Sequence, residues 1–281
     1  MDFLNRCIVC GEGAQSRKYW EILRRCDDCS HVWADLDEGE FQDDEVYSED
    51  YFLGGDYGNY LNDADVFKKH FQDRLRDCRN FLQSGHLLEV GCAYGLFLRE
   101  ASSCFDVCGY DIAPEPVKHA RDVFKLDARC EEFANAQIEP ESFDAVVLWD
   151  TIEHLPRPDL TLKKVSMVLR PGGYCFLTTG DIGSLLARFR KRRWRMIHPP
   201  THLHYFNKQS ILRILESVGF SEVQFKYVGV RRSFRQVAFG LFQLGREQPS
   251  KINNSMQKLP GINLSFILNT FDIMMVVAKK V

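Results

Sequence analysis

The segment that most constrains the fold is LLEVGCAYG, at residues 87–95. Its first four residues form an apolar run of strand length, and helix signals follow at residues 96–101. Gly91 and Gly95 allow a tight turn and a close approach of the backbone to a ligand. Asp111 ends a second strand-like segment, FDVCGYD, where a carboxylate can accept both hydroxyl hydrogens of a ribose. A strand, a glycine turn and a helix form the first unit of a nucleotide-binding α/β sheet, so the sequence predicts a nucleoside site.

The spacing of the glycines helps to separate two nucleoside cofactors. A dinucleotide site typically has GxGxxG, with a pyrophosphate on the helix N-terminus. Here position 93 is Ala, the glycines are four residues apart, and Glu89 precedes them. A carboxylate beside the loop suits a ligand with a cationic amino group better than a pyrophosphate. A glycine turn that binds no ligand is the alternative interpretation.

At these residues the chain resembles motif I, E-x-G-x-x-x-G, of class I S-adenosylmethionine-dependent methyltransferases, with Asp111 as their ribose-binding acid. The segment FDAVVLWDTIEHLPRPDLTLKKVSMVLRPGGYCFLTT, at residues 143–179, resembles the later motifs of the same enzymes, including the proline and paired glycines before the fifth strand. The resemblance covers residues 85–281. It implies a Rossmann-like, seven-stranded and mostly parallel sheet with an antiparallel last strand, and methyl transfer from S-adenosylmethionine. The cofactor-binding residues that it implies are Glu89, Gly91, Tyr94, Gly95, Asp111, Ile112, Cys130, Glu131, Trp149 and Asp150.

Four of the ten cysteines form a pattern, two CxxC pairs separated by fifteen residues: Cys7, Cys10, Cys26 and Cys29. This spacing is typical of two knuckles that close on one tetrahedral zinc. Residues 1–34 are too short for a core of their own, so metal binding would supply their folding energy. We therefore expect a small N-terminal zinc ribbon with a structural Zn²⁺, which docks a substrate or partner; a redox dithiol or coincidental pairs are the alternatives.

Length and charge set the remaining bounds. A chain of 281 residues can bury one substantial core and carry a smaller appendage. The net charge of −3 gives no global attraction to nucleic acid. The first residues lack the pattern of a signal peptide, no apolar run reaches membrane-spanning length, and reduced cysteines fit a reducing compartment, so a cytoplasmic protein is expected.

Residues 35–84 are expected to connect the two parts. Nine of the sixteen residues at 35–50 are acidic, which is typical of a solvated linker. The aromatic and glycine-rich residues 51–61 suit a lid over a ligand or simple packing. Apolar residues recur at helical spacing over residues 67–82, which predicts a helix packed on the sheet. Residues 231–270 are interpreted as a helical insertion that caps the substrate pocket, forms a dimer face or contacts a membrane surface.

Histidines and a basic run are the candidates for catalysis and substrate binding. His154 follows the fourth strand and could act as a general base or a structural hydrogen-bonding group. HPPTHLHYF resembles the P-x-H-L-x-Y-F loop of small-molecule methyltransferases, which implies that His202 and Tyr205 face the substrate. Six of the eight residues at 188–195 are basic, and such a run could hold a phosphate, a lipid or an RNA backbone. The substrate-binding candidates are Arg192, Arg193, Trp194, His198 and His204.

The function expected from these features is methyl transfer to a small molecule, with an oxygen of a sugar, glycan or related metabolite as the acceptor and with a phosphate as one option for the basic run. An RNA methyltransferase is the second interpretation, which the acidic linker and the missing NPPY-type motif oppose. The third is a noncatalytic cofactor-binding scaffold. A monomer and a homodimer are both compatible with the sequence.

Overall fold

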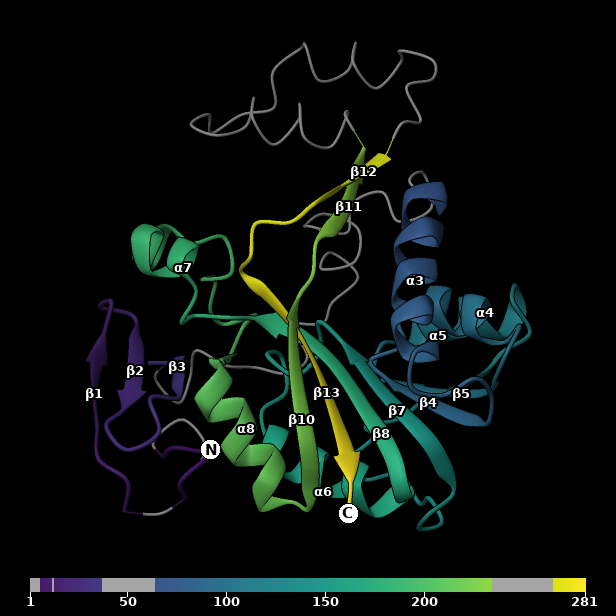
Figure 1. Ribbon diagram of the computed structural model, residues 1–281, viewed down its shortest axis with the longest axis horizontal. Coiled ribbons are helices and arrows are strands. Elements are labelled where there is room, and N and C mark those ends of the chain that lie inside the picture. Colours follow the sequence, from purple (N-terminus) through teal and green to yellow (C-terminus); the bar gives the residue numbers. More distant parts are fainter. Residues whose placement is uncertain (1–5, 12, 37–63, 234–264) are drawn as a thin grey trace.

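The computed structural model describes residues 6–11, 13–36, 64–233 and 265–281 (Figure 1). Most of the predicted acidic linker, the aromatic segment 51–61 and the body of the predicted helical insertion lie outside the described residues. The described part consists of a central sheet with helices on both faces and a small N-terminal sheet beside one edge (Figure 1).

The central sheet has seven strands in the order β10-β13-β8-β7-β4-β5-β6. The strands are β4 (His86–Val90), β5 (Asp106–Asp111), β6 (Asp127–Cys130), β7 (Phe143–Trp149), β8 (Leu169–Gly180), β10 (Phe220–Tyr227) and β13 (Ile273–Lys280). Neighbours from β6 to β8 pair in parallel, whereas β13 is antiparallel to both β8 and β10. The predicted fold class, a mostly parallel seven-stranded sheet with an antiparallel last strand, is confirmed.

Helices cover both faces of this sheet, which explains why its central strand β7 is buried along most of its length. On one face, α3 (Ala64–Arg79), α4 (Leu96–Ala101) and α5 (Pro114–Asp122) pack into a cluster that includes Leu75, Phe97 and Val117. On the other face lie α6 (Pro158–Val168) and α8 (Lys208–Ser217), which contribute to a second cluster. Helix α3 is the packing helix that the apolar spacing of residues 67–82 predicts.

The N-terminal sheet is completed by a strand from the methyltransferase-like part of the chain. It consists of β1 (Ser16–Tyr19), β2 (Leu23–Cys26), β3 (Val32–Ala34) and β9 (His204–Tyr205), in that order. Val32 pairs with Tyr205 and Trp33 with His204, antiparallel. The cysteine-rich segment and the loop that contains β9 therefore form one folded unit. The predicted domain boundary at residue 34 does not include this strand.

The basic run forms α7 (Leu185–Arg190) and a short 3-10 helix, η2 (Lys191–Arg193), at the side of the molecule (Figure 1). The described ends of the predicted helical insertion are strands, β11 (Val230–Ser233) and β12 (Ser265–Leu268), which pair with each other antiparallel. No helix in the described part of the chain is long and apolar enough to cross a membrane.

Candidate active site

A cavity of about 300 Å³ lies at the carboxyl ends of β4, β5 and β7. The glycine loop after β4 forms one wall, and the residues that follow β7 form another. In a parallel α/β sheet this edge is where ligands bind, because the loops after neighbouring strands diverge there. Most of the residues predicted to bind the cofactor converge on it: Glu89, Gly91, Tyr94, Asp111, Ile112, Glu131, Trp149 and Asp150.

The glycines of the loop are required by both conformation and space. Gly91 has φ +78° and Gly95 has φ +72°, in the left-handed region that residues with a Cβ rarely adopt. A Cβ at Gly91 would lie 2.6 Å from Thr151 Oγ1, and one at Gly95 would lie 2.8 Å from Leu126 Cδ1. Gly95 does not line the cavity itself but begins α4 as its N-cap. The two glycines let the loop turn closely above β4.

Asp111 is held at the end of β5 by the loops around it. The Ala93 N–H donates to its Oδ2 at 2.8 Å, and the Ala113 N–H donates to its Oδ1 at 2.9 Å. Burial raises the pKa of Asp111, and the two N–H donors oppose that rise. Each oxygen keeps a lone pair, so the carboxylate can accept a further hydrogen bond from a ribose hydroxyl.

Glu89 is a buried carboxyl group on the cavity wall, with 3% of its surface exposed. Its Oε2 has no hydrogen-bond partner among the described residues. Burial, and then the charge of Asp111, raise the pKa of Glu89 well above its usual range. A buried acid without a partner at a ligand cavity fits a cationic group of the ligand, such as the amino group of S-adenosylmethionine, and the site therefore fits this cofactor.

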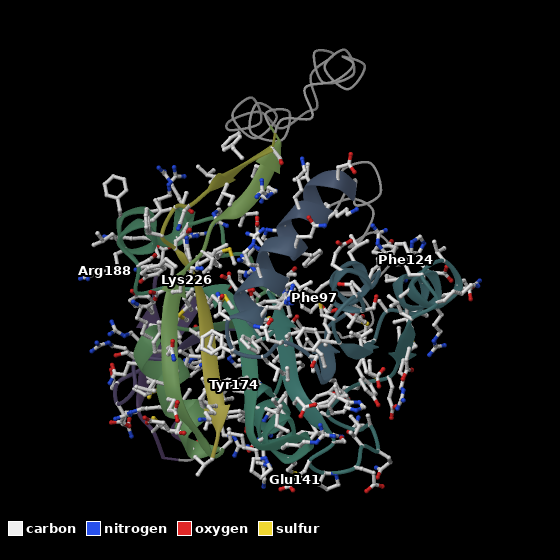
Figure 2. The ribbon with its side chains drawn as sticks, turned by 45° about the vertical axis from the view of Figure 1, so that its right-hand side comes forward. Phe97, Phe124, Glu141, Tyr174, Arg188 and Lys226 are labelled. Carbon is white, nitrogen blue, oxygen red and sulfur yellow. The ribbon has the colours of Figure 1, made fainter. Side chains whose placement is uncertain are left out.

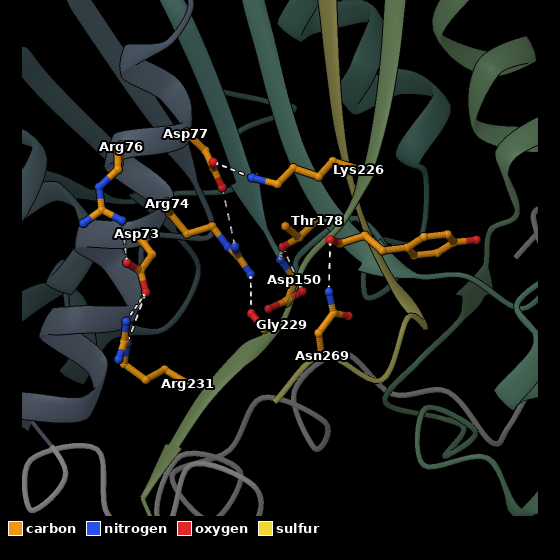
Figure 3. Close-up of polar contacts among 11 residues, drawn as sticks. Asp73, Arg74, Arg76, Asp77, Asp150, Thr178, Lys226, Gly229, Arg231 and Asn269 are labelled. Atoms are coloured by element: carbon orange, nitrogen blue, oxygen red, sulfur yellow. Dashed lines mark hydrogen bonds and ion pairs between the residues drawn. The ribbon is translucent and has the colours of Figure 1, made fainter. Parts of the chain in front are cut away.

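The end of β7 contributes an aromatic ring and a second acid. Asp150 has φ +49°, and its Oδ1 accepts a hydrogen bond from Thr178 Oγ1 at 2.8 Å (Figure 3). The buried Trp149 Nε1 has no partner among the described residues. The positive φ of Asp150 is a strained conformation, and such residues are typical of functional sites, where the surrounding structure fixes them. Cys130, in contrast, does not line the cavity, and its Sγ lies 3.6 Å from the Ile112 carbonyl oxygen.

His154 lines the cavity and is neutral near pH 7. Its Nδ1 lies 2.9 Å from the Thr201 carbonyl oxygen, which fixes the tautomer that carries the proton on Nδ1. Burial lowers the pKa of His154 to about 4, although the Thr201 carbonyl opposes this shift. A neutral imidazole with Nε2 as its acceptor atom is the form that a general base requires.

The other predicted substrate residues do not line this cavity. His202 packs edge-to-face against His154, with ring centroids 4.5 Å apart, and its Nδ1 lies 2.9 Å from the Met196 carbonyl oxygen. His198 packs on His202 from the other side, with ring centroids 3.9 Å apart. The Tyr205 hydroxyl donates to the His202 carbonyl oxygen at 3.0 Å, and His204 is buried in β9, beside β3. These residues form the layer behind His154.

The basic run also lies away from the cavity. Arg192 pairs with Glu21 of the N-terminal sheet at 2.6 Å, and Arg193 belongs to the same exposed 3-10 helix. Trp194 is buried, and its Nε1 donates to Asp272 Oδ2 at 2.7 Å. Figure 2 shows Arg188 at the outer edge of the molecule, far from the cavity-lining Phe97.

The four patterned cysteines come together as the sequence predicts. Their sulfurs lie within 4.8 Å of one another, with 3.4 Å between Cys7 and Cys29 and 3.9 Å between Cys26 and Cys10. A tetrahedral zinc with Zn–S bonds of about 2.3 Å implies sulfurs roughly 3.8 Å apart, so this donor set fits Zn²⁺. Each knuckle ends in a left-handed residue, Gly11 at φ +81° and Ser30 at φ +61°.

A second group that could hold a metal ion is Glu153, His154 and His202, whose ligand atoms also lie within 4.8 Å of one another. No carboxylate stands among His198, His202 and His204 in the sequence, and Glu153 is about fifty residues away from His202 along the chain. The fold brings the two together. Both Glu153 oxygens are buried without a hydrogen-bond partner in the described part of the chain, and burial, together with the charge of Asp150, raises the pKa of Glu153 to about 8. The nearby Thr179 hydroxyl opposes this shift.

Sheet order and cavity define a class of protein, the nucleoside-cofactor-binding α/β enzymes with a seven-stranded sheet. A family model described as a methyltransferase domain matches residues 65–225, more than half of the chain. The chain belongs to this family. The prediction of a class I S-adenosylmethionine-dependent methyltransferase is thereby confirmed.

Relatives and solved structures agree with this assignment. A ubiquinone biosynthesis O-methyltransferase from Xanthomonas campestris is 37% identical over 106 residues, which cover 35% of this chain and 44% of the relative. The chain thus matches less than half of that relative's length. A methyltransferase from Thermotoga maritima shares the fold, with a TM-score of 0.55, 16% identity, and coverage of 84% of this chain and 99% of that one. A phosphoethanolamine N-methyltransferase from Haemonchus contortus, solved with S-adenosylmethionine, has a TM-score of 0.53 at 15% identity, with 89% and 61% covered.

Proposed function

We propose that the protein transfers a methyl group from S-adenosylmethionine to an oxygen of a small molecule, such as a sugar, a glycan or a quinone-like metabolite. The observation that best supports S-adenosylmethionine as the cofactor is the pair of acids Glu89 and Asp111 on one cavity wall. The Xanthomonas relative is named as an O-methyltransferase of ubiquinone biosynthesis, which supports oxygen as the acceptor atom and a small molecule as the substrate. Its partial coverage leaves the acceptor itself to experiment.

The residues of the cavity have distinct roles in this reaction. Bound S-adenosylmethionine supplies an electrophilic methyl group on a sulfonium. Asp111 binds the ribose hydroxyls, and Glu89 binds the amino group. His154 takes the hydroxyl proton of the acceptor while the oxygen–carbon bond forms and the sulfur–carbon bond breaks, which leaves S-adenosylhomocysteine. Trp149 and Asp150 border the methyl group and align the acceptor oxygen behind it.

The proposal also includes a structural zinc, a cellular compartment and an oligomeric state. We propose that Cys7, Cys10, Cys26 and Cys29 hold one structural Zn²⁺, because they leave no open ligand position. None of the ten cysteines forms a disulfide, which is compatible with the reducing, cytoplasmic setting that we propose. A monomer or a homodimer is expected.

RNA methylation is kept as a second candidate because of one observation, the exposed arginines of α7 and η2. These side chains could contact a phosphate backbone outside the cavity. Affinity for generic RNA that falls steeply with salt would favour this candidate.

The test uses methyl-labelled S-adenosylmethionine and fractionated cell extract. We expect label in a small-molecule fraction with the wild type, and none with Asp111→Ala, which loses the ribose acceptor. Label in RNA would replace the small-molecule proposal with the RNA candidate. If the protein binds the cofactor and no fraction is ever labelled, the scaffold interpretation replaces both.

A further inference from the structure

The outer face of α7 carries two apolar side chains that are almost fully exposed. Leu185 is 84% exposed and Phe189 is 86% exposed, the largest fractions among the exposed large apolar side chains of the described residues. The two are four positions apart, so they lie one turn apart on the same face of the helix. Isolated apolar side chains on a surface are common, whereas two neighbours on one helix face indicate a surface that contacts a partner.

The inner face of the same helix is packed against the body of the protein. Ala187 is fully buried and Leu186 is partly buried, in a cluster that also contains Trp194 and residues of the N-terminal sheet. Leu185 and Phe189 do not belong to this cluster. The helix is therefore held in place by its inner side chains, and its outer side chains are presented to the surroundings in a fixed orientation.

Cations without a partner accompany this apolar pair. Four exposed cations of α7 and η2 form no ion pair within 4.0 Å in the described part of the chain: Arg188, Arg190, Lys191 and Arg193. The other two cations of the basic run are paired, Arg192 with Glu21 at 2.6 Å and Arg195 with Asp272 at 2.8 Å. Figure 2 shows Arg188 at the outer edge of the molecule. The four unpaired cations thus leave a positive charge on this side of the protein that a partner can neutralise.

We propose that this face, which consists of Leu185, Phe189 and the four unpaired cations, docks on the surface of an anionic lipid bilayer. The two apolar side chains insert between the lipid headgroups, and the cations contact lipid phosphates. An RNA backbone would also neutralise the cations, and its bases would stack on Phe189, but it would leave the aliphatic Leu185 in water. A lipid surface accounts for both the charge and the apolar pair. The inference concerns a surface outside the cofactor cavity and does not depend on the methyl acceptor.

The test measures co-sedimentation of the full chain with vesicles of phosphatidylcholine alone or of equal parts phosphatidylcholine and phosphatidylglycerol. We expect the wild type to bind the anionic vesicles about tenfold or more tightly than the neutral ones, and to bind them more weakly as salt is added. The double variant Leu185→Ser, Phe189→Ser should lose about tenfold or more in affinity, because both apolar anchors are removed. Arg188→Gln with Arg190→Gln should lose about tenfold or more, since each cation contributes roughly fivefold near an anionic surface.

The matched controls lie on α5 and at its end, on the opposite side of the molecule from α7 (Figure 1). Val123→Ser removes an apolar side chain that is 58% exposed, and Lys118→Gln with Lys125→Gln removes two exposed cations. Both should leave vesicle binding unchanged within twofold.

Amide hydrogen exchange of the wild type is a second measurement that needs no variant, and we expect anionic vesicles to slow exchange in residues 185–195. Absence of wild-type binding to anionic vesicles would overturn the inference. Equal binding by the wild type and the folded Leu185→Ser, Phe189→Ser variant would overturn it as well, because charge alone would then hold the protein on the vesicle. Binding to single-stranded RNA in place of vesicles, lost in the double arginine variant, would assign this face to RNA instead.

Discussion

At the scale of single residues, the cofactor cavity depends on acids whose protonation differs from that of exposed acids. Glu89 has an unpartnered oxygen and a raised pKa, whereas Asp111 is stabilised by two backbone N–H donors. The two are on adjacent strands, and the charge of Asp111 helps to raise the pKa of Glu89. A bound cation would reverse this effect, because an opposite charge favours the ionised form.

We therefore predict that cofactor binding releases protons through Glu89. The pKa of Glu89 in the free protein lies well above its usual value, so part of the population is protonated when the ligand is absent. Binding of the amino group lowers that pKa, and the affinity rises with pH until the pH exceeds the pKa of Glu89 in the free protein. Calorimetric titration with S-adenosylhomocysteine in buffers of different ionisation enthalpy measures the protons released.

Glu89→Gln should bind the ligand about tenfold or more weakly, since a charged hydrogen bond is lost, and should release fewer protons. Glu216→Gln, on the exposed face of α8, is the control. Equal proton release by the wild type and Glu89→Gln would show that another group is responsible.

His154 provides the second residue-scale prediction. With a pKa near 4, its imidazole is neutral across the physiological range, so activity should not fall from its protonation until the pH drops toward 4. His154→Gln should lower kcat by about 10²- to 10⁴-fold, the usual contribution of a general base. Single-turnover rates and the affinity for S-adenosylhomocysteine are the measurements.

The matched control is His86→Gln, because His86 is half exposed at the opposite end of β4. A lowered rate together with an unchanged ligand affinity supports a base. A rate that stays at the wild-type level assigns His154 to a structural role.

At the scale of elements, the cysteine-rich sheet is joined directly to the cavity wall. The His31 N–H lies 3.5 Å from Cys29 Sγ, and His31 Nε2 lies 3.1 Å from His204 Nδ1. His204 Nε2 lies 3.4 Å from the carbonyl oxygen of Pro156, a cavity-lining residue. The Leu203 and His204 N–H groups also donate to the Glu153 carbonyl oxygen. A continuous path of contacts runs from the cysteine cluster to the segment 153–157.

Loss of the cysteine cluster should therefore loosen the cavity wall. Cys26→Ser removes one buried ligand, and we expect it to weaken binding of S-adenosylhomocysteine severalfold and to increase amide hydrogen exchange in residues 153–157. Cys104→Ser is the control, because Cys104 is a half-buried thiol outside the cluster. Increased exchange confined to residues 6–36, with unchanged ligand affinity, would contradict the coupling.

The same elements show how far the sequence predicts the structure. Strands and the glycine loop were predictable because apolar runs and glycine spacing are local patterns. The two-residue strand β9 was not, since its pairing with β3 joins residues more than 170 positions apart and carries no periodicity. From the sequence alone, Arg74 is one polar residue of an amphipathic helix, and Glu153 is one acid in a loop. Their burial, and the distance of Arg192 from the cavity, follow from tertiary contacts alone.

At the scale of the whole molecule, the fold buries an unusual number of neutral histidines. His31, His154, His202 and His204 are each at most 9% exposed. Burial lowers the pKa of His154 and His204 to about 4 and that of His202 to about 2, and His31 shifts in the same direction. In the unfolded chain these groups would titrate near 6.5. The unfolded chain therefore binds more protons between pH 4 and 6.5.

This difference predicts a steep loss of stability in mild acid. Stability rises with pH wherever the unfolded state binds more protons, so the contribution of these histidines is complete above pH 6.5 and is lost as the pH falls toward 4. Glu89 and Glu153 act in the opposite direction, because their raised pKa values mean that the folded protein binds protons that the unfolded chain releases above about pH 4.5. His70 also has a lowered pKa, so five histidines act against these two acids, and we expect a net loss of stability as the pH falls from 6.5 toward 4.

Denaturant unfolding at pH 7.0, 6.0 and 5.5, with release of the proposed zinc followed in parallel by a chromogenic chelator, separates this effect from loss of a metal. We expect the free energy of unfolding to fall over this range before zinc is released. His204→Phe keeps a buried aromatic ring in β9 and removes one titrating group, so the stability of this variant should depend less on pH by about one proton. A stability that stays constant down to the pH at which zinc leaves would assign acid sensitivity to the cysteines instead of the buried histidines.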